Sequence, residues 1–91
     1  MLTVTNAAGE VIRSLTQRAH LPDGAGLRLS RDPEHRSLHM GLAVHAEPGD
    51  VTVFAHDEVP VFVEPLVCTQ LVAQTLDAEV RDGERRFYVH A

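Results

Sequence analysis

The sequence predicts an α+β domain, in which an N-terminal helix packs on antiparallel β-strands in a sandwich-like arrangement. The main observation is a change of hydrophobic period, from every three or four residues before Gly26 to every second residue after it. A second observation is that only one short helical segment, near residues 65–73, interrupts the strands that follow. A chain of 91 residues has room for one hydrophobic core, so we expect residues 1–91 to form a single domain.

The first element is predicted as an amphipathic helix over residues 6–19. Its apolar side chains recur at helical spacing: Ala8, Val11, Ile12, Leu15 and Ala19. Thr5 precedes this pattern, and its hydroxyl group can accept a hydrogen bond from a free backbone N–H of the first turn. The segment from Pro22 to Gly26 then ends the helix, because proline and glycine favour turns.

Four strands are expected next, with apolar and polar residues alternating along them. Their approximate ranges are 27–30, 38–45, 51–55 and 59–63. The clearest alternation runs from Leu38 to His45, and Pro48-Gly49-Asp50 provides the turn after it. Pro60 lacks a backbone donor, which indicates that it lies on an edge strand or at the start of a strand.

The last two strands are predicted to form a hairpin around Asp82-Gly83, a favoured two-residue turn. The turn fixes the pairing as Leu76 with Val89, Ala78 with Phe87, Glu79 with Arg86, and Arg81 with Glu84. The first two pairs are apolar and share one face, whereas the last two place opposite charges together on the other face. Before the hairpin, Pro65 suits the first turn of the short helix.

Composition argues against several classes of function. The net charge of −5 repels a phosphate backbone, so we expect no nucleic-acid partner. No apolar segment approaches the ~18 residues that a membrane span needs, and Met1–Asn6 lacks the pattern of a secretion signal. The one cysteine, Cys68, cannot form an intramolecular disulfide. These observations predict a cytoplasmic protein with no membrane partner.

Several short motifs occur in a fixed order along almost the whole chain. They are Leu2-Thr3-Val4-Thr5, Gly26-Leu27-Arg28-Leu29, Pro48-Gly49-Asp50-Val51, Val59-Pro60-Val61-Phe62-Val63-Glu64, and Leu71 followed by Leu76-Asp77. In order and spacing they resemble the HesB/IscA-like family, the A-type carriers of iron–sulfur cluster assembly. The resemblance implies a HesB-like domain and a role associated with iron–sulfur cluster assembly.

The resemblance also implies three ligand cysteines, one in the loop after the strand at Leu27–Leu29 and two near the C-terminus. In this sequence Arg36 stands at or beside the position of the loop cysteine, and no cysteine follows Cys68. The chain is therefore predicted to be a divergent member without a complete cluster site of its own. Cys68 falls where the resemblance places an aliphatic residue of the short helix, so we interpret it as a core residue.

Three residues remain as candidates for a weak metal site: His35, His39 and Cys68. The two histidines have the spacing of a helical His-x-x-x-His pair, but Arg36 places a cation between them. We therefore expect no cofactor, and iron or an iron–sulfur cluster only if two or more subunits share Cys68. No combination of residues predicts catalysis, so we do not expect an enzyme.

Two functions remain open. In the first, the protein is an accessory of iron–sulfur cluster assembly, with assembly or recipient proteins as partners and a homo-oligomer as a further option. In the second, it is a non-metal binding or interaction module that keeps only the fold. The acidic residues in the middle of the chain form either a solvated surface or a docking patch for a basic partner: Glu47, Asp50, Asp57, Glu58 and Glu64.

Overall fold

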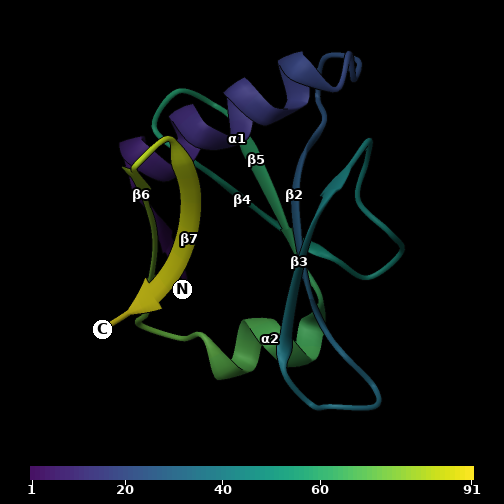
Figure 1. Cartoon of the computed structure of the whole chain (residues 1–91). Helices are drawn as coiled ribbons and strands as arrows, with labels where there is room; N and C mark the ends of the chain where they lie inside the picture. The colour runs from purple at the N-terminus through teal and green to yellow at the C-terminus, as the bar shows by residue number, and fades with distance from the viewer.

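The computed structural model describes the whole chain, residues 1–91. Its elements are, in order, β1 (Thr3–Val4), α1 (Asn6–Arg18), β2 (Gly26–Arg31), β3 (Leu38–Ala43), β4 (Val51–Phe54), β5 (Pro60–Val63), α2 (Pro65–Gln70), β6 (Thr75–Arg81) and β7 (Glu84–His90). One sheet has the strand order β1-β6-β7, and the other has the order β3-β2-β5-β4. Figure 1 shows α1 across one end of the molecule and α2 at the opposite end. The predicted α+β class is confirmed.

Both helices begin where the sequence predicts. Thr5 caps α1, because its Oγ1 accepts a hydrogen bond from the Ala8 N–H at 3.1 Å. Pro65 is the first residue of α2, as expected. The second helix is shorter than predicted and ends at Gln70, since Ala73 has a left-handed backbone (φ 62°) that an α-helix cannot contain.

The strand directions differ from the prediction, because each sheet contains one parallel pair. In one sheet β2 runs parallel to β5, with Leu27 opposite Val61. In the other, β1 runs parallel to β6, with Thr3 opposite Thr75. The remaining three pairs are antiparallel. The expectation that all strands are antiparallel was therefore wrong. Alternation of apolar and polar residues shows which face of a strand is buried, but it does not show the direction of the neighbouring strand.

The C-terminal hairpin forms in the predicted register. The observed pairs include Leu76 with Val89, Ala78 with Phe87, Glu79 with Arg86, and Arg81 with Glu84. Both turn residues have positive φ, 52° at Asp82 and 80° at Gly83, as a type I′ turn requires. The turn and the apolar alternation agree on one register, which explains why this element could be predicted in detail.

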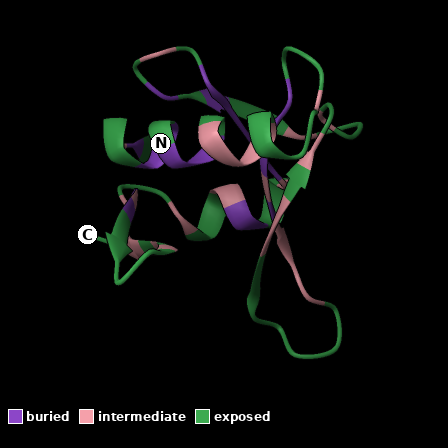
Figure 2. Cartoon of the chain, turned by 45° about the horizontal axis from the view of Figure 1, so that its top comes forward, coloured by how far each residue is buried: buried purple, intermediate pink, exposed green.

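The hydrophobic core is aliphatic and lies between α1, α2 and the facing sides of the two sheets. Its largest fully buried side chains are Leu2, Ile12, Leu29, Leu76, Val61, Val63 and Val67. Figure 2 shows buried residues on the inner side of α1 and along the central strands, whereas the loop between β2 and β3 is exposed. Pro60 is the first residue of β5, which lies inside its sheet. Neither helix is long and apolar enough to span a membrane.

Candidate functional site

The loop between β2 and β3, residues 32–37, contains the position at which the family resemblance places a cysteine. Its shape depends on Asp32, whose Oδ1 accepts hydrogen bonds from the N–H groups of Glu34 at 2.9 Å and His35 at 3.3 Å. The other oxygen, Oδ2, lies 3.2 Å from His35 Nδ1. These contacts, with the Glu34 N–H as the largest cause, hold the pKa of Asp32 below its usual value. The loop is therefore ordered by its own hydrogen bonds.

Arg36 lies within this loop and has a left-handed backbone, with φ of 56°. Its N–H donates a hydrogen bond to the Asp32 carbonyl oxygen at 2.8 Å. Its side chain is exposed and forms no ion pair with an acidic residue. A free guanidinium group beside His35 repels a divalent cation, so the charge at this position opposes metal binding.

The structure does not bring the three candidate metal ligands together. His35 and His39 are exposed on the β2–β3 hairpin, and the His35 side chain is 72% exposed. Cys68 lies on α2, where it is half-buried and packs against the hydrophobic core, in agreement with its interpretation as a core residue. No group of three or more His, Cys, Asp or Glu side chains could hold a metal ion. Within one chain, these residues therefore do not form a ligand set for a cluster.

A second polar cluster surrounds Asp77 on β6. Asp77 Oδ1 accepts hydrogen bonds from Thr5 Oγ1 and from the Ala78 N–H, both at 2.8 Å. Its Oδ2 accepts one from the Tyr88 hydroxyl at 3.2 Å and lies 3.4 Å from His90 Nε2. The Thr5 hydrogen bond is the largest cause that keeps the pKa of Asp77 below its usual value.

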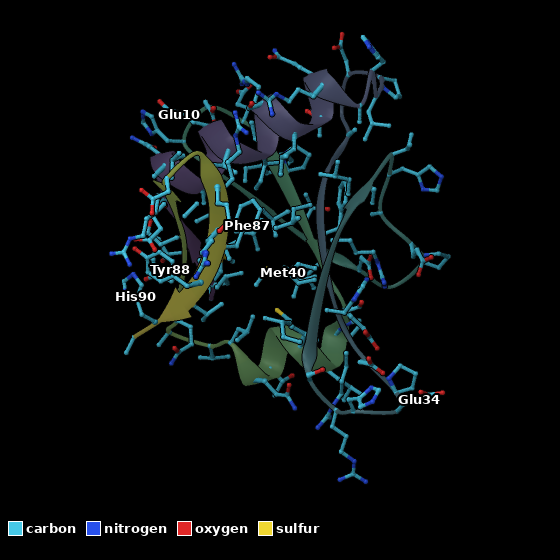
Figure 3. All side chains as sticks on the ribbon, viewed as in Figure 1. Glu10, Glu34, Met40, Phe87, Tyr88 and His90 are labelled. Carbon is cyan, nitrogen blue, oxygen red and sulfur yellow. The ribbon has the colours of Figure 1, made fainter.

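The Asp77 cluster connects the start of α1 to the hairpin. Figure 3 shows Tyr88 and His90 on the outer side of β7, and their rings stack with centroids 5.6 Å apart. Loss of hydration, followed by the hydrogen bond to Asp77, raises the pKa of Tyr88 above its usual value. The contact between Tyr88 and Asp77 could be predicted from the hairpin register, which places the two residues opposite each other. The contact with Thr5 could not, because it spans 72 positions and has no local sequence signal.

Four of the five acidic residues in the middle of the chain are bound to residues of the protein itself. Asp50 and Glu47 form ion pairs with Arg28, Asp57 forms one with Arg13, and Glu64 Oε2 accepts a hydrogen bond from the Arg31 N–H. Only Glu58 has no such partner. These carboxylates therefore hold loops and strands in place, which argues against the alternative of an acidic docking patch.

A polar surface hollow of about 310 Å³ lies between the end of α1 and the start of β5. Arg13, Gln17, Asp23 and Glu58 are among its lining residues, and it contains no histidine or cysteine. None of the residues singled out in the sequence as candidate ligands contributes to it. The hollow therefore does not extend the candidate site at the β2–β3 loop.

No known protein family profile matches the sequence, and no curated protein matches it. The structure, however, is similar over almost its whole length to several solved structures. Escherichia coli SufA, a protein involved in the biosynthesis of iron–sulfur clusters, matches 98% of this chain and 83% of its own with a TM-score of 0.77 and 23% identity. IscA with its [2Fe-2S] cluster matches 99% of this chain and 81% of its own with a TM-score of 0.69 and 16% identity. The fold implied by the family resemblance is confirmed.

Proposed function

We propose that this protein is a non-catalytic accessory of iron–sulfur cluster assembly that acts by binding assembly or recipient proteins in the cytoplasm. The observation that carries the proposal is the match of 98% of the chain to the fold of a protein involved in iron–sulfur cluster biosynthesis. The sequence motifs support the same assignment independently, because they follow the order and spacing of the A-type carriers. Similarity of fold alone would be weaker support, since one fold can host several functions.

The proposal assigns the protein a role in contacts rather than in holding a cluster with its own residues. Iron–sulfur clusters are held mainly by cysteine thiolates. This chain has one cysteine, which packs against the core, and Arg36 stands in the loop where the resemblance places a ligand. The chemistry of the available side chains therefore supports a partner-binding role.

Anaerobic reconstitution with ferrous iron and sulfide tests the absence of a cluster site. We expect no visible charge-transfer bands and no stoichiometric iron in the isolated protein. The competing possibility is a cluster shared between subunits through Cys68, which predicts a brown colour and assembly of the protein during reconstitution. The matched control is Cys68→Ser: colour in the wild type that this substitution abolishes would overturn the proposed lack of a site.

A cluster-transfer assay tests the accessory role itself. Cluster-loaded IscA and an apo-ferredoxin are mixed with increasing amounts of the protein, and transfer is followed by visible circular dichroism. We expect the transfer rate to change with the concentration of the protein, because an accessory must contact the carrier or the recipient. An unchanged rate together with no binding to either protein would contradict the accessory role. The alternative, a non-metal binding or interaction module that keeps only the fold, would then be favoured. It fits the same two observations, Arg36 at the loop position and Cys68 packed on the core.

A further inference from the structure

The polar hollow of about 310 Å³ beside α1 has an apolar floor and a charged rim. Pro60, the first residue of β5, lies on the floor together with Val59 and Ala25, and all three residues are buried. Asp23 and Glu58 are exposed and form part of the rim. Figure 1 shows α1 across this end of the molecule, close to the connection between β4 and β5. The hollow therefore suits a group that is apolar along its length and polar at its tip.

Hydrogen bonds between α1 and the β4–β5 turn hold the hollow open. Arg13 Nη2 donates to the Asp57 carbonyl oxygen at 2.9 Å and lies 3.5 Å from Asp57 Oδ2. Within the turn, the Ala55 N–H donates to the Val59 carbonyl and the Glu58 N–H donates to the Ala55 carbonyl, both at 2.9 Å. The backbone of Glu58 is therefore fixed relative to the helix, so the hollow is formed before any ligand binds.

The rim carries negative charge that the protein itself does not balance. The one basic residue of the lining, Arg13, is paired with Asp57. Asp23 and Glu58 form no ion pair with any residue of the chain. Gln17, which also lines the hollow, belongs to the last turn of α1, and the C-terminal end of a helix has a partial negative charge. The electrostatics of the hollow therefore favour a cationic ligand.

An exposed aromatic ring adjoins the hollow on the side of β4. Phe54 lies opposite Pro60 in the β4–β5 pairing and is 62% exposed. Phe54 and Glu58 together line a second, shallow depression, so the Glu58 carboxylate lies between the polar hollow and the ring. A free cation would use only the hollow. A basic side chain of a protein can use both surfaces, because the residue next to it in the partner can cover Phe54.

We propose that the hollow binds an arginine side chain of a partner protein. The guanidinium group binds Glu58 and Asp23, the aliphatic stem lies on the floor, and an adjacent apolar residue of the partner packs on Phe54. Arginine fits better than lysine, because its planar group has five donors and can bind two carboxylates at once. Long basic side chains also bury their methylene groups while the charge stays near water. This is one defined pocket with two free carboxylates, in contrast to a broad acidic patch.

The inference rests on the protein-binding part of the proposed function and adds the chemistry of one contact. The test is a titration of the ¹⁵N-labelled full chain with the peptide acetyl-Leu-Arg-Leu-amide, followed by NMR. We expect saturable shifts of the backbone amide signals that are concentrated at Gln17, Ala25, Glu58 and Val59. The same peptide with citrulline in place of arginine keeps the shape without the charge, and we expect it to cause no such shifts. No cluster protein is present, so failure here leaves the cluster-transfer test of the proposed function unaffected.

Substitutions at the rim identify the carboxylates. We expect Glu58→Gln and Asp23→Asn each to raise the Kd of the arginine peptide by about fivefold, the effect of losing one exposed charge pair. The matched control is Glu10→Gln, because Glu10 is an exposed acidic residue of α1 that does not line the hollow, and we expect an unchanged Kd. Equal effects of all three substitutions would show general attraction to a negative surface and would overturn the proposal.

Phe54→Ala distinguishes a partner protein from a small cation as the ligand. We expect it to weaken binding of the peptide and to leave the weaker binding of N-acetyl-arginine amide unchanged. If the amide binds as tightly as the peptide, the hollow is a site for small organic cations and the partner-protein proposal is wrong. Equal binding of the citrulline peptide, or shifts located away from the hollow, would also overturn it.

Discussion

The ion pair between Arg28 and Asp50 is expected to be a major local contribution to stability. Arg28 on β2 binds the carboxylate with two nitrogens, Nε to Oδ2 at 2.9 Å and Nη2 to Oδ1 at 3.0 Å. Asp50 Oδ2 also accepts a hydrogen bond from the Glu47 N–H at 2.9 Å, which closes the turn before β4. The Asp50 side chain is only 1% exposed. One carboxylate thus joins the turn to the middle of the sheet.

The cost of removing this carboxylate follows from the contacts that are lost. Removing one member of a buried ion pair typically costs ~3–5 kcal/mol. Arg28 is 22% exposed and keeps Glu47 at 3.1 Å, so solvent screening and the second acid reduce the loss. We expect Asp50→Ala to lower the free energy of unfolding by about 2–3 kcal/mol. For Asp50→Asn, which keeps the volume and one acceptor, we expect about 1–2 kcal/mol.

The pH dependence of stability provides a sharper test. The Arg28 hydrogen bond holds the pKa of Asp50 below its usual value. A carboxyl group with a lowered pKa in the folded state stabilises the protein above its unfolded pKa of about 3.9, and this contribution is lost as the pH falls through the folded value. The stability difference between wild type and Asp50→Asn should therefore be constant near neutral pH and shrink below about pH 4.

Urea denaturation followed by circular dichroism, between neutral pH and pH 3, measures these differences. The control is Glu84→Gln, which removes an ion pair with Arg86 whose side chains are 68% and 64% exposed. We expect this control to change stability by less than about 0.5 kcal/mol, because exposed ion pairs contribute little. A loss of the same size for Asp50→Ala, or a difference that does not depend on pH, would refute the reasoning.

Three further predictions concern the other ordered contacts. Thr5→Val should cost about 1–2 kcal/mol in a denaturant melt, because it removes both the cap of α1 and the hydrogen bond to Asp77. Thr69→Val, at an exposed hydroxyl, should cost much less. Phe87→Ala should cost about 2 kcal/mol. This is less than the cost for a fully buried phenylalanine, because Phe87 is only partly buried. A loss below about 1 kcal/mol would show that Phe87 does not pack on the core. Cys68 should react slowly with a thiol reagent in the native protein and rapidly after unfolding, and native labelling as fast as that of a peptide would contradict its packing on the core.

The parts of the fold that could be predicted are those specified within a short segment. The first helix follows from its apolar spacing and from the Thr5 cap, three residues from the N–H that it binds. The hairpin follows from the turn at Asp82 and from the alternation on both sides of it. In both cases, the residues that determine the structure are close in sequence, so a local pattern contains the information.

The remaining features depend on contacts between distant segments. The parallel pairing of Leu27 with Val61 joins strands separated by two others, and both strands would show the same alternation if they were antiparallel. Arg28 and Asp50 are 22 positions apart, and nothing in either motif indicates that they meet. The sequence is more informative about the candidate site than about strand pairing, because a ligand set depends first on which residue types are present. One cysteine, with Arg36 at the loop position, is by itself enough to argue against a complete cluster site within one chain.

The loop that contains Arg36 links this departure from the family pattern to the proposed role. Asp32 orders the loop by accepting hydrogen bonds from the backbone N–H groups of Glu34, His35 and Arg36. Arg36 occupies a left-handed position at an exposed hairpin end, where its charge faces solvent. An ordered loop with an unpaired cation offers a charged group for contact with another protein, in keeping with the proposed accessory role. The β2–β3 hairpin thus ends in a loop ordered by its own hydrogen bonds, with an exposed arginine where the family resemblance places a cysteine.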